Sequence, residues 1–360
     1  MKKTNFFEIH QRLGAKIVEF AGYLMPIQYG SIIGEHKAVR NSVGVFDVSH
    51  MGEVIVTGKN ALEFVQNITV NDASKLSPGR VQYSAMCYPD GGIVDDLLVY
   101  KISDEQFMLV INASNIEKDF NWMNVNNSFN VKIENQSEEY SLLAVQGPSS
   151  KDVLQKICNR NLDLEYYHFF HAKIAGYEML ISRTGYTGEL GYELYFKGDR
   201  KMAEEVWNKI FEAGNEFNIQ PVGLGARDSL RLEMGFCLYG NDIDQTTNPL
   251  EAGLGWITKL NKVNFIAKDV LLKIKSDGLK RKLIALSSEE KCFPRHGYDI
   301  SISGKKIGTI TSGTVSPVLE KPIALGYIDS NYSKEDSEVN FLIRGKESAA
   351  KVVGLPFVKK

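Results

Sequence analysis

The chain has 360 residues, more than a single hydrophobic core normally serves, so two or three domains are expected. Hydrophobic residues make up 43% of the chain and charged residues 24%, a composition typical of globular proteins rather than disordered ones. The 42 Lys and Arg residues nearly balance the 44 Asp and Glu residues. This balance indicates neither a general nucleic-acid binder nor a protein that binds anionic membranes.

The four cysteines lie far apart and form no CxxC pair, which argues against a redox or zinc site of that kind and predicts buried or incidental thiols. Residues 1–9 contain two lysines but no apolar segment, so no signal peptide is predicted. No apolar stretch approaches the roughly 20 residues that span a membrane. The expected compartment is therefore the cytoplasm.

Residues 81–102 are predicted to form a β-hairpin. Two strand-like runs, 81–88 and 93–102, flank the turn sequence PDGG. A third strand is expected over 107–114. Ser114 is followed three residues later by Glu, the spacing of a capping box, which predicts a helix there. Its apolar stripe would consist of Ile116, Phe120 and Met123.

Two further helices and a change of pattern follow. One helix is expected to begin near Asp199, and another to follow Pro221 and stop at Gly235. The apolar face of the first would consist of Met202, Val206, Trp207, Ile210 and Phe211. After about Leu279, short apolar runs recur between Gly, Pro, Asn and Ser residues, which predicts a small all-β domain, a barrel or sandwich.

Several of the expected strands are joined by hairpins, which favours the α+β class over a doubly wound parallel sheet. We place a domain boundary near residue 278. Residues 1–278 would then form two interleaved α+β subdomains, and residues 279–360 the C-terminal β domain.

Asp95 and Asp96 lie in the second strand of the predicted hairpin and must point to opposite faces. Both faces are otherwise apolar, so at least one carboxylate has an apolar setting, which is costly without a partner or a function. The alternative is that both carboxylates lie near the turn and accept hydrogen bonds from the backbone.

The segment 183–196, RTGYTGELGYELYF, combines Gly185, Gly188 and Gly191 with a following strand. Such a backbone can approach a flat ligand closely. Glu193 would share a strand face with Gly191 and Tyr195, which suits a planar heterocycle with adjacent N–H donors. A solvated glutamate on an edge strand is the alternative.

Arg227 and Arg231 are four residues apart in the predicted helix after Pro221, so they share a face. Two guanidinium groups on one face could bind a dicarboxylate. The alternative is a pair of surface charges bridged to Asp228 or Glu233. Other functions are not supported by the sequence, because no Walker A sequence is present and the His168 and His171 pair comes without the signal of a third metal ligand.

Seven segments together resemble the aminomethyltransferase family, the T-proteins of glycine cleavage systems, and they follow the family's order over nearly the whole chain. They are FAGYLMPIQY (20–29), FDVSHMGEV (46–54), GGIVDDLLVY (91–100), LLAVQGP (142–148), GYTGELGYE (185–193), GLGARDSLRLEMGFCLYGNDID (223–244) and KIGTITSGTVSP (306–317).

The resemblance implies three domains in a cloverleaf around a central folate channel, the last domain β-rich. It implies tetrahydrofolate as the one-carbon acceptor and the lipoylated H-protein as partner, carrying the aminomethyl group. It assigns the catalytic role to Asp96 and folate contacts to Glu193 and Arg227. Asn112 matches a residue at the family's pocket, and by the same resemblance Tyr83, Met51 and Tyr186 are expected to line it.

One departure concerns the C-terminus. Relatives commonly have an aromatic or basic residue there that closes on the folate, and here only Lys359 or Lys360 could serve, so neither is assigned. Three rival functions remain: a non-catalytic folate-binding relative used in iron–sulfur cluster maintenance, a demethylating oxidase, and a scaffold subunit. The cysteine-centred motif of the iron–sulfur relatives is absent from this sequence. The oxidases carry an additional flavin domain, for which 360 residues leave no room.

Overall fold

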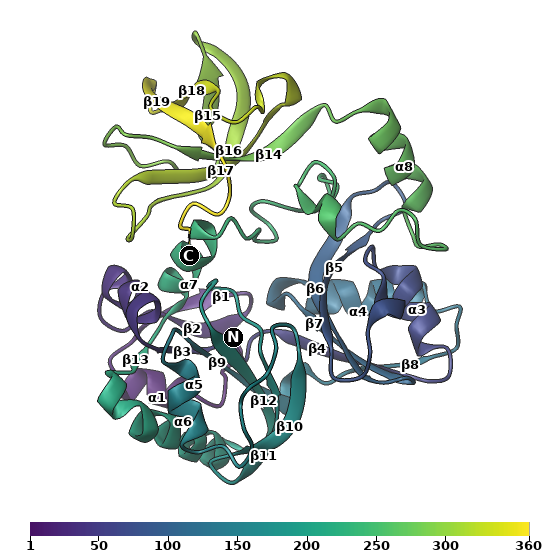
Figure 1. The fold of residues 1–360 in the computed structure, drawn as a ribbon, viewed down its shortest axis with the longest axis vertical. Helices are drawn as coiled ribbons and strands as arrows, with labels where there is room; N and C mark the ends of the chain where they lie inside the picture. Colours follow the sequence, from purple (N-terminus) through teal and green to yellow (C-terminus); the bar gives the residue numbers. More distant parts are fainter. Residues whose placement is uncertain (360) are drawn as a thin grey trace. The chain divides into compact units, whose positions relative to one another are not determined.

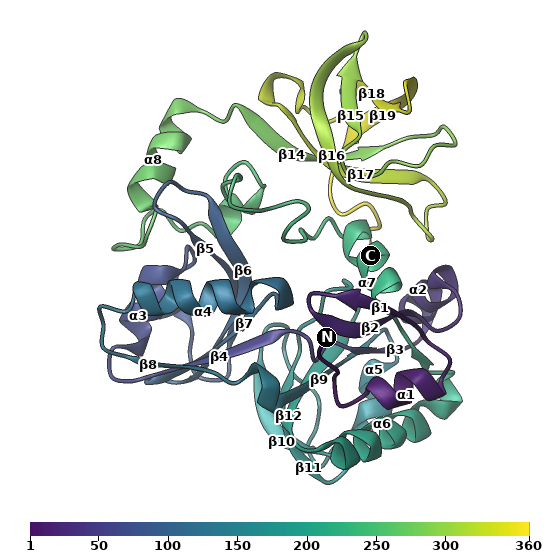
Figure 2. The same ribbon diagram turned by 180° about the vertical axis from the view of Figure 1, so that it is seen from behind.

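The computed structural model describes residues 1–359, which combine helices with four sheets (Figures 1 and 2). The α+β class expected from the sequence is confirmed. The chain divides into two compact units, and neither is a continuous segment. The first unit comprises residues 1–65, 73–82 and 97–228, and the second comprises residues 66–72, 83–96 and 229–360.

A six-stranded sheet forms the centre of the first unit. Its strand order is β10-β11-β12-β9-β3-β13. In that order the strands are Phe169–Ile174, Tyr177–Ser182, Gly191–Lys197, Tyr140–Gln146, Gly44–Asp47 and Gln220–Pro221. The unit also contains the two-stranded sheet of β1 (Lys16–Phe20) and β2 (Tyr23–Gln28) and the helix α2 (Ile32–Asn41).

One face of this sheet packs into a hydrophobic core of the first unit. On β12, Tyr192, Leu194 and Phe196 point into that core. The helices α1 (Phe7–Arg12), α5 (Ser150–Gln155) and α6 (Arg200–Gly214) contribute side chains to the same core (Figure 1). Because strand residues alternate, Gly191, Glu193 and Tyr195 lie on the opposite face. The apolar core thus fixes the direction in which Glu193 points.

The predicted hairpin forms part of a five-stranded sheet with the order β5-β6-β7-β4-β8. In that order the strands are Val81–Cys87, Ile93–Ser103, Gln106–Ile111, Gly52–Thr57 and Lys132–Asn135. Two helices belong to this part of the chain, α3 (Ala61–Ile68) and α4 (Ile116–Val125). The helix α4 packs closely on β4, because a side chain at Gly52 would come within 2.7 Å of Ile116.

The predicted capping box at Ser114 does not form. Residues Ala113–Asn115 make a turn of 3-10 helix, and α4 begins only at Ile116. Its N-cap residue, Asn115, makes no capping hydrogen bond through its side chain. The prediction at Asp199 is confirmed, because the Asp199 side chain accepts a hydrogen bond from the backbone N–H of Met202 at 2.9 Å, where α6 begins.

The second unit ends in a closed six-stranded barrel, which confirms the all-β C-terminal domain (Figure 2). Its strand order is β14-β17-β16-β15-β18-β19. In that order the strands are Arg281–Ser287, Pro322–Asp329, Lys305–Val315, Asp299–Ile302, Glu338–Ile343 and Lys346–Val353. The helix α8 (Lys268–Asp277) precedes the barrel, and α7 (Leu224–Glu233) runs from the first unit into the second.

Candidate active site

Glu193 is a buried carboxylate of the first unit, with 7% of its surface exposed. The strand that carries it, β12, lies between β11 and β9, so the alternative of a solvated glutamate on an edge strand is wrong. Its carboxylate accepts hydrogen bonds from the hydroxyl of Thr184 and, at 3.3 Å, from that of Tyr195. Burial raises the pKa of Glu193, although these hydroxyls and the charge of Arg227 oppose the shift.

A group of hydroxyls surrounds Glu193 and connects strands of two sheets within the first unit. The Tyr100 hydroxyl, on β6, lies 3.0 Å from the Tyr195 hydroxyl and donates to Ser182 at 3.1 Å. The two tyrosine rings pack edge to face with centroids 5.6 Å apart. The face of the five-stranded sheet that bears Tyr100 is therefore turned toward the face of the six-stranded sheet that bears Glu193.

The glycine-rich segment folds around one side chain, Gln146. A Cβ atom at Gly185 would lie 2.1 Å from the Gln146 amide, and one at Gly191 would lie 2.3 Å from it. The Gln146 amide donates to the Thr184 carbonyl at 3.1 Å and accepts from the Thr187 hydroxyl at 2.8 Å. These two glycines thus make room for a protein side chain, which corrects the expectation that they serve the approach of a ligand.

Hydrogen bonds from Arg40 of α2 hold the same segment in place, and the segment borders a cavity. The Arg40 guanidinium donates to the Thr187 carbonyl at 2.6 Å and to the Glu189 carboxylate at 2.9 Å. A cavity of about 220 Å³ opens along the segment, and Tyr166 and Arg183 also line it. The first unit therefore offers a rigid concave surface next to the strand that carries Glu193.

Arg227 lies in the first turns of α7 and is half-buried. Its guanidinium stands 4.8 Å from the centre of the Tyr186 ring, a cation–π contact. Burial lowers the pKa of Arg227, while Tyr186 and Glu193 oppose the shift. The start of α7 is held by Glu35, whose carboxylate accepts from the backbone N–H of Gly223 at 2.8 Å.

Arg231 has a different role from Arg227, because it is 1% exposed and pairs with Asp242 at 2.6 Å. It also donates to the Ser312 hydroxyl on β16 at 2.7 Å. Of the two arginines predicted to bind a ligand, only Arg227 therefore remains a candidate. The alternative of two surface ion pairs is also wrong for Arg231, because both partners of its ion pair are buried.

Asp95 and Asp96 both lie in the second unit and differ in burial. Asp95 is fully buried, whereas Asp96 is half-buried. The Tyr83 hydroxyl, on β5, donates a hydrogen bond to the Asp96 carboxylate at 2.9 Å. The Tyr83 ring lies 6.1 Å from that of Trp256, which is 63% exposed. Asp96 is thus the member of the pair that a ligand can reach, and it is oriented by a hydroxyl.

The two remaining predicted site residues lie in the first unit and are half-buried. Met51 immediately precedes β4, and Asn112 immediately follows β7. Five of the seven predicted residues are therefore in the first unit, and Asp96 and Tyr83 are in the second.

Among the buried ionisable residues of the FDVSHMGEV segment, His50 and Glu53 were not predicted as site residues. His50 is 2% exposed, and burial together with the nearby charge of Arg227 lowers its pKa to about 4. Glu53 is 1% exposed, and burial raises its pKa well above the usual value. The available signal was the position of Glu53 in a strand where the three following residues are apolar.

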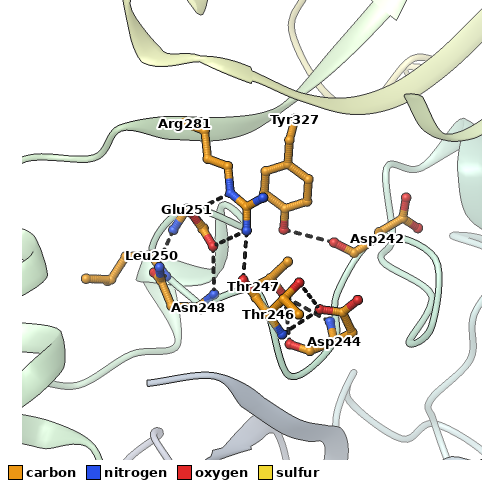
Figure 3. Close-up of polar contacts among 9 residues, drawn as sticks. All are labelled: Asp242, Asp244, Thr246, Thr247, Asn248, Leu250, Glu251, Arg281 and Tyr327. Carbon is orange, nitrogen blue, oxygen red and sulfur yellow. Dashed lines mark hydrogen bonds and ion pairs between the residues drawn. The ribbon is translucent and has the colours of Figure 1, made fainter. Parts of the chain in front are cut away.

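A larger cavity, of about 310 Å³, lies in the second unit, and the charged residue at its wall, Arg281, is bound by other residues of the protein. The Arg281 guanidinium at its wall donates to the Glu251 carboxylate at 3.0 and 3.1 Å and to the Thr246 carbonyl at 2.8 Å (Figure 3). It also stands 4.8 Å from the centre of the Tyr327 ring. Arg281 therefore joins the barrel to the preceding loop, and its charge is neutralised within the protein.

Comparison with known proteins places this chain in a family. Residues 6–262 match the GCVT N-terminal domain, and residues 281–359 match the glycine cleavage T-protein C-terminal barrel domain. The chain belongs to the aminomethyltransferase family, the glycine cleavage T-proteins. Among residues 1–359, no helix is long and apolar enough to cross a membrane, and no three His, Cys, Asp or Glu side chains gather as metal ligands would.

Individual aminomethyltransferases are similar over their full length. The chain is 52% identical to the enzyme of Halothermothrix orenii, covering 99% of this chain and all of that one. It is 53% identical to the enzyme of Flavobacterium psychrophilum, with both chains fully covered. The solved structure of glycine cleavage system aminomethyltransferase T from Bartonella henselae matches with a TM-score of 0.92 at 34% identity, covering 99% of this chain and 98% of that one.

Proposed function

We propose that this protein transfers the methylene of the aminomethyl group on the dihydrolipoyl arm of H-protein to tetrahydrofolate. The products are 5,10-methylenetetrahydrofolate, ammonia and dihydrolipoyl H-protein. The observation that carries the proposal is the similarity to aminomethyltransferases over the whole chain. It supports tetrahydrofolate as the acceptor substrate and the lipoylated H-protein as the macromolecular partner.

The reaction requires one carbon to exchange two bonds for two others. Its bonds to sulfur and to the amino nitrogen break, and bonds form to N5 and N10 of the folate. The two protons that these nitrogens lose leave with the thiol and with ammonia. A carboxylate near the reacting atoms can hold one of these protons in transit and stabilise positive charge on the carbon as ammonia departs.

We assign that role to Asp96. Its half-buried position supports access to a substrate, and the hydrogen bond from Tyr83 supports a fixed orientation. We assign folate binding to Glu193 and Arg227, on the strength of a buried carboxylate that suits N–H donors and a half-buried guanidinium that suits an anionic group. Asn112, Tyr83, Met51 and Tyr186 are proposed as further folate contacts.

The Asp96→Asn variant tests the catalytic role. General acid–base catalysis contributes roughly 10²–10⁴-fold, so ammonia release from aminomethylated H-protein should fall by about that factor. Tetrahydrofolate binding, measured by titration calorimetry, should stay within about threefold of wild type, because the amide keeps the shape of the carboxylate. Asp104→Asn, at an exposed residue in the β6–β7 turn, is the matched control and should keep full activity.

Two results would contradict the proposal. Full turnover in Asp96→Asn would remove the catalytic assignment. Tight tetrahydrofolate binding by the wild-type protein without ammonia release would favour the non-catalytic folate-binding relative. Glu193→Ala and Arg227→Ala complete the test, because both should weaken folate binding in the same calorimetric titration.

A further inference from the structure

Glu53, on β4, is a buried acid whose carboxyl group makes no hydrogen bond in the part of the chain that the structure describes. It is 1% exposed, and neither of its carboxyl oxygens has a hydrogen-bond partner among residues 1–359. Its backbone is satisfied, because the N–H donates to the Ser137 hydroxyl at 3.0 Å and the carbonyl accepts from the N–H of Gln136 at 2.9 Å. The missing interaction therefore concerns the carboxyl group alone, and a buried polar group without a partner is costly.

The strand register shows which way this carboxyl group points. Glu53 lies opposite Val110 on β7, and Val110 lies opposite Leu98 on β6, so the three side chains form a row on one face. Tyr100, two residues beyond Leu98, shares that face and contacts Tyr195. The other face of β4 packs on α4 at Gly52. Glu53 therefore points toward the sheet face that bears Glu193.

The ionisable groups around Glu53 are acidic. Glu193 on β12 raises the pKa of Glu53 further, after the larger effect of burial. Glu53 in turn raises the pKa of three tyrosines, Tyr195 on β12, Tyr140 on β9 and Tyr23 on β2. Two carboxyl groups thus share a buried region lined by hydroxyls, and only one of them, Glu193, accepts hydrogen bonds from those hydroxyls.

We propose that Glu53 is a second carboxyl group that binds the reduced pterin ring, alongside Glu193. This inference rests on the proposed function. The pterin of tetrahydrofolate carries an exocyclic amine and an N3–H on its pyrimidine ring and an N8–H on the adjoining reduced ring. One carboxylate accepts two adjacent donors of this set, which leaves further donors for a second acceptor. Glu53 supplies that acceptor and acts in substrate binding, not in proton transfer to the reacting carbon.

Ligand binding should change the protonation of Glu53. Burial and, to a smaller extent, Glu193 raise the pKa of Glu53 and so favour its protonated form in the free protein, whereas a ring that offers N–H donors favours the ionised carboxylate. Binding should therefore release a proton from Glu53 to the buffer, and affinity should rise with pH across the range in which the free protein still holds that proton. A buried acid with a purely structural role would show no such link to the ligand.

Calorimetric titration of the full chain with tetrahydrofolate tests this, between pH 5 and 8 and in two buffers of different ionisation enthalpy. Glu53→Gln should weaken binding about 10- to 100-fold, as expected for loss of hydrogen bonds to a charged acceptor. Binding of tetrahydrofolate to this variant should also release about one proton fewer than binding to wild type. Glu105→Gln, at an exposed glutamate in the turn before β7, is the matched control and should change neither quantity.

The outcomes separate the two proposals. Wild-type protein that does not bind tetrahydrofolate would overturn the proposed function and this inference with it. Wild-type protein that binds, together with a Glu53→Gln variant of equal affinity and equal proton release, would overturn this inference alone. If Glu53→Gln failed to fold, the wild-type titrations would still decide, because an affinity that does not change with pH contradicts the predicted proton release.

Discussion

His50 lies two residues before β4, and its imidazole is surrounded by protein on all sides. The ring packs edge to face on Phe20, with centroids 5.5 Å apart, and its Nδ1 has no hydrogen-bond partner among residues 1–359. A protonated imidazole would therefore be poorly solvated, and Arg227 adds repulsion. At neutral pH this residue is an uncharged packing element in the unliganded protein.

The depressed pKa of His50 predicts a loss of stability in acid. The folded protein keeps the imidazole neutral down to about pH 4, whereas the unfolded chain protonates it near 6.5. The unfolded state binds more protons in that window, so the free energy of unfolding falls as the pH falls from 6.5 to 4. The loss attributable to His50 is up to about 1.4 kcal/mol per pH unit.

Urea denaturation across this pH range measures the effect. A His50→Gln variant should show a shallower dependence on pH than wild type, because glutamine cannot take up the proton. His171→Gln, at an exposed position on β10, is the control and should follow the wild-type curve. Identical slopes for wild type and His50→Gln would show that the imidazole does not stay neutral in the folded state.

At the scale of elements, α7 carries two arginines that meet different surroundings. In the first unit, Arg227 contacts the Tyr186 ring. In the second unit, Arg231 binds Asp242, and Asp242 also accepts hydrogen bonds from the Thr311 hydroxyl at 2.5 Å and the Ser312 hydroxyl at 3.0 Å. The last turn of α7 is therefore tied to β16 through a buried, fully hydrogen-bonded charge pair.

Replacing Arg231 by Met should cost about 3–5 kcal/mol of unfolding free energy, because Asp242 would remain buried without its counter-ion. The double variant Arg231→Met, Asp242→Asn should recover part of this loss. Chemical denaturation measures both. Arg200→Met, which breaks an exposed ion pair on α6, serves as the control and should change stability by less than about 1 kcal/mol. A comparably small loss for Arg231→Met would mean that the pair is not needed.

The regular elements followed from local sequence patterns. The hairpin was expected over 81–88 and 93–102, and the strands are Val81–Cys87 and Ile93–Ser103. The start of the α6 helix near Asp199 was also predicted correctly, because apolar periodicity is a local signal. The capping box at Ser114 was wrong, because the chain inserts a turn of 3-10 helix before α4.

Contacts between residues that are far apart in the sequence could not be predicted from local patterns. Arg231 meets Ser312 across 81 residues of sequence, and Gln146 fills the space beside Gly185 and Gly191. Both contacts depend on pairing between strands and helices far apart in the chain. Glu53 was missed for a related reason, since its burial depends on a sheet whose register the sequence does not reveal. The catalytic and folate-binding roles, and the domain boundary near 278, stay predictions.

At the scale of the whole molecule, the second unit gathers three separate stretches of chain. Its barrel supplies partners to residues that precede it by many positions. The Glu233 carboxylate accepts from the Ser316 hydroxyl at 2.5 Å, and Leu232 packs against Ile323 and Leu325 of β17. Residues 229–251 consequently depend on the barrel for the burial of their charges and apolar groups. By contrast, Leu254, Ile257 and Leu271 lie in a core with Val70 and Ile93.

A chain that ends at Gly278 should therefore keep a folded first unit but lose order in residues 229–251. Limited proteolysis followed by mass spectrometry should find the earliest cuts within 229–251, while residues 97–228 resist. The intact protein under the same conditions is the control. Equal resistance of residues 229–251 in both proteins would contradict the expected dependence on the barrel.

The path of the chain also limits how this protein can be synthesised and rearranged. Five junctions, near residues 65, 72, 82, 96 and 228, carry the polypeptide back and forth from one unit to the other. A growing chain on the ribosome cannot complete the first unit before residue 228 has emerged, and the second must wait for the final strands. No single recombination point in the gene could transfer either unit intact, so the two are inherited together.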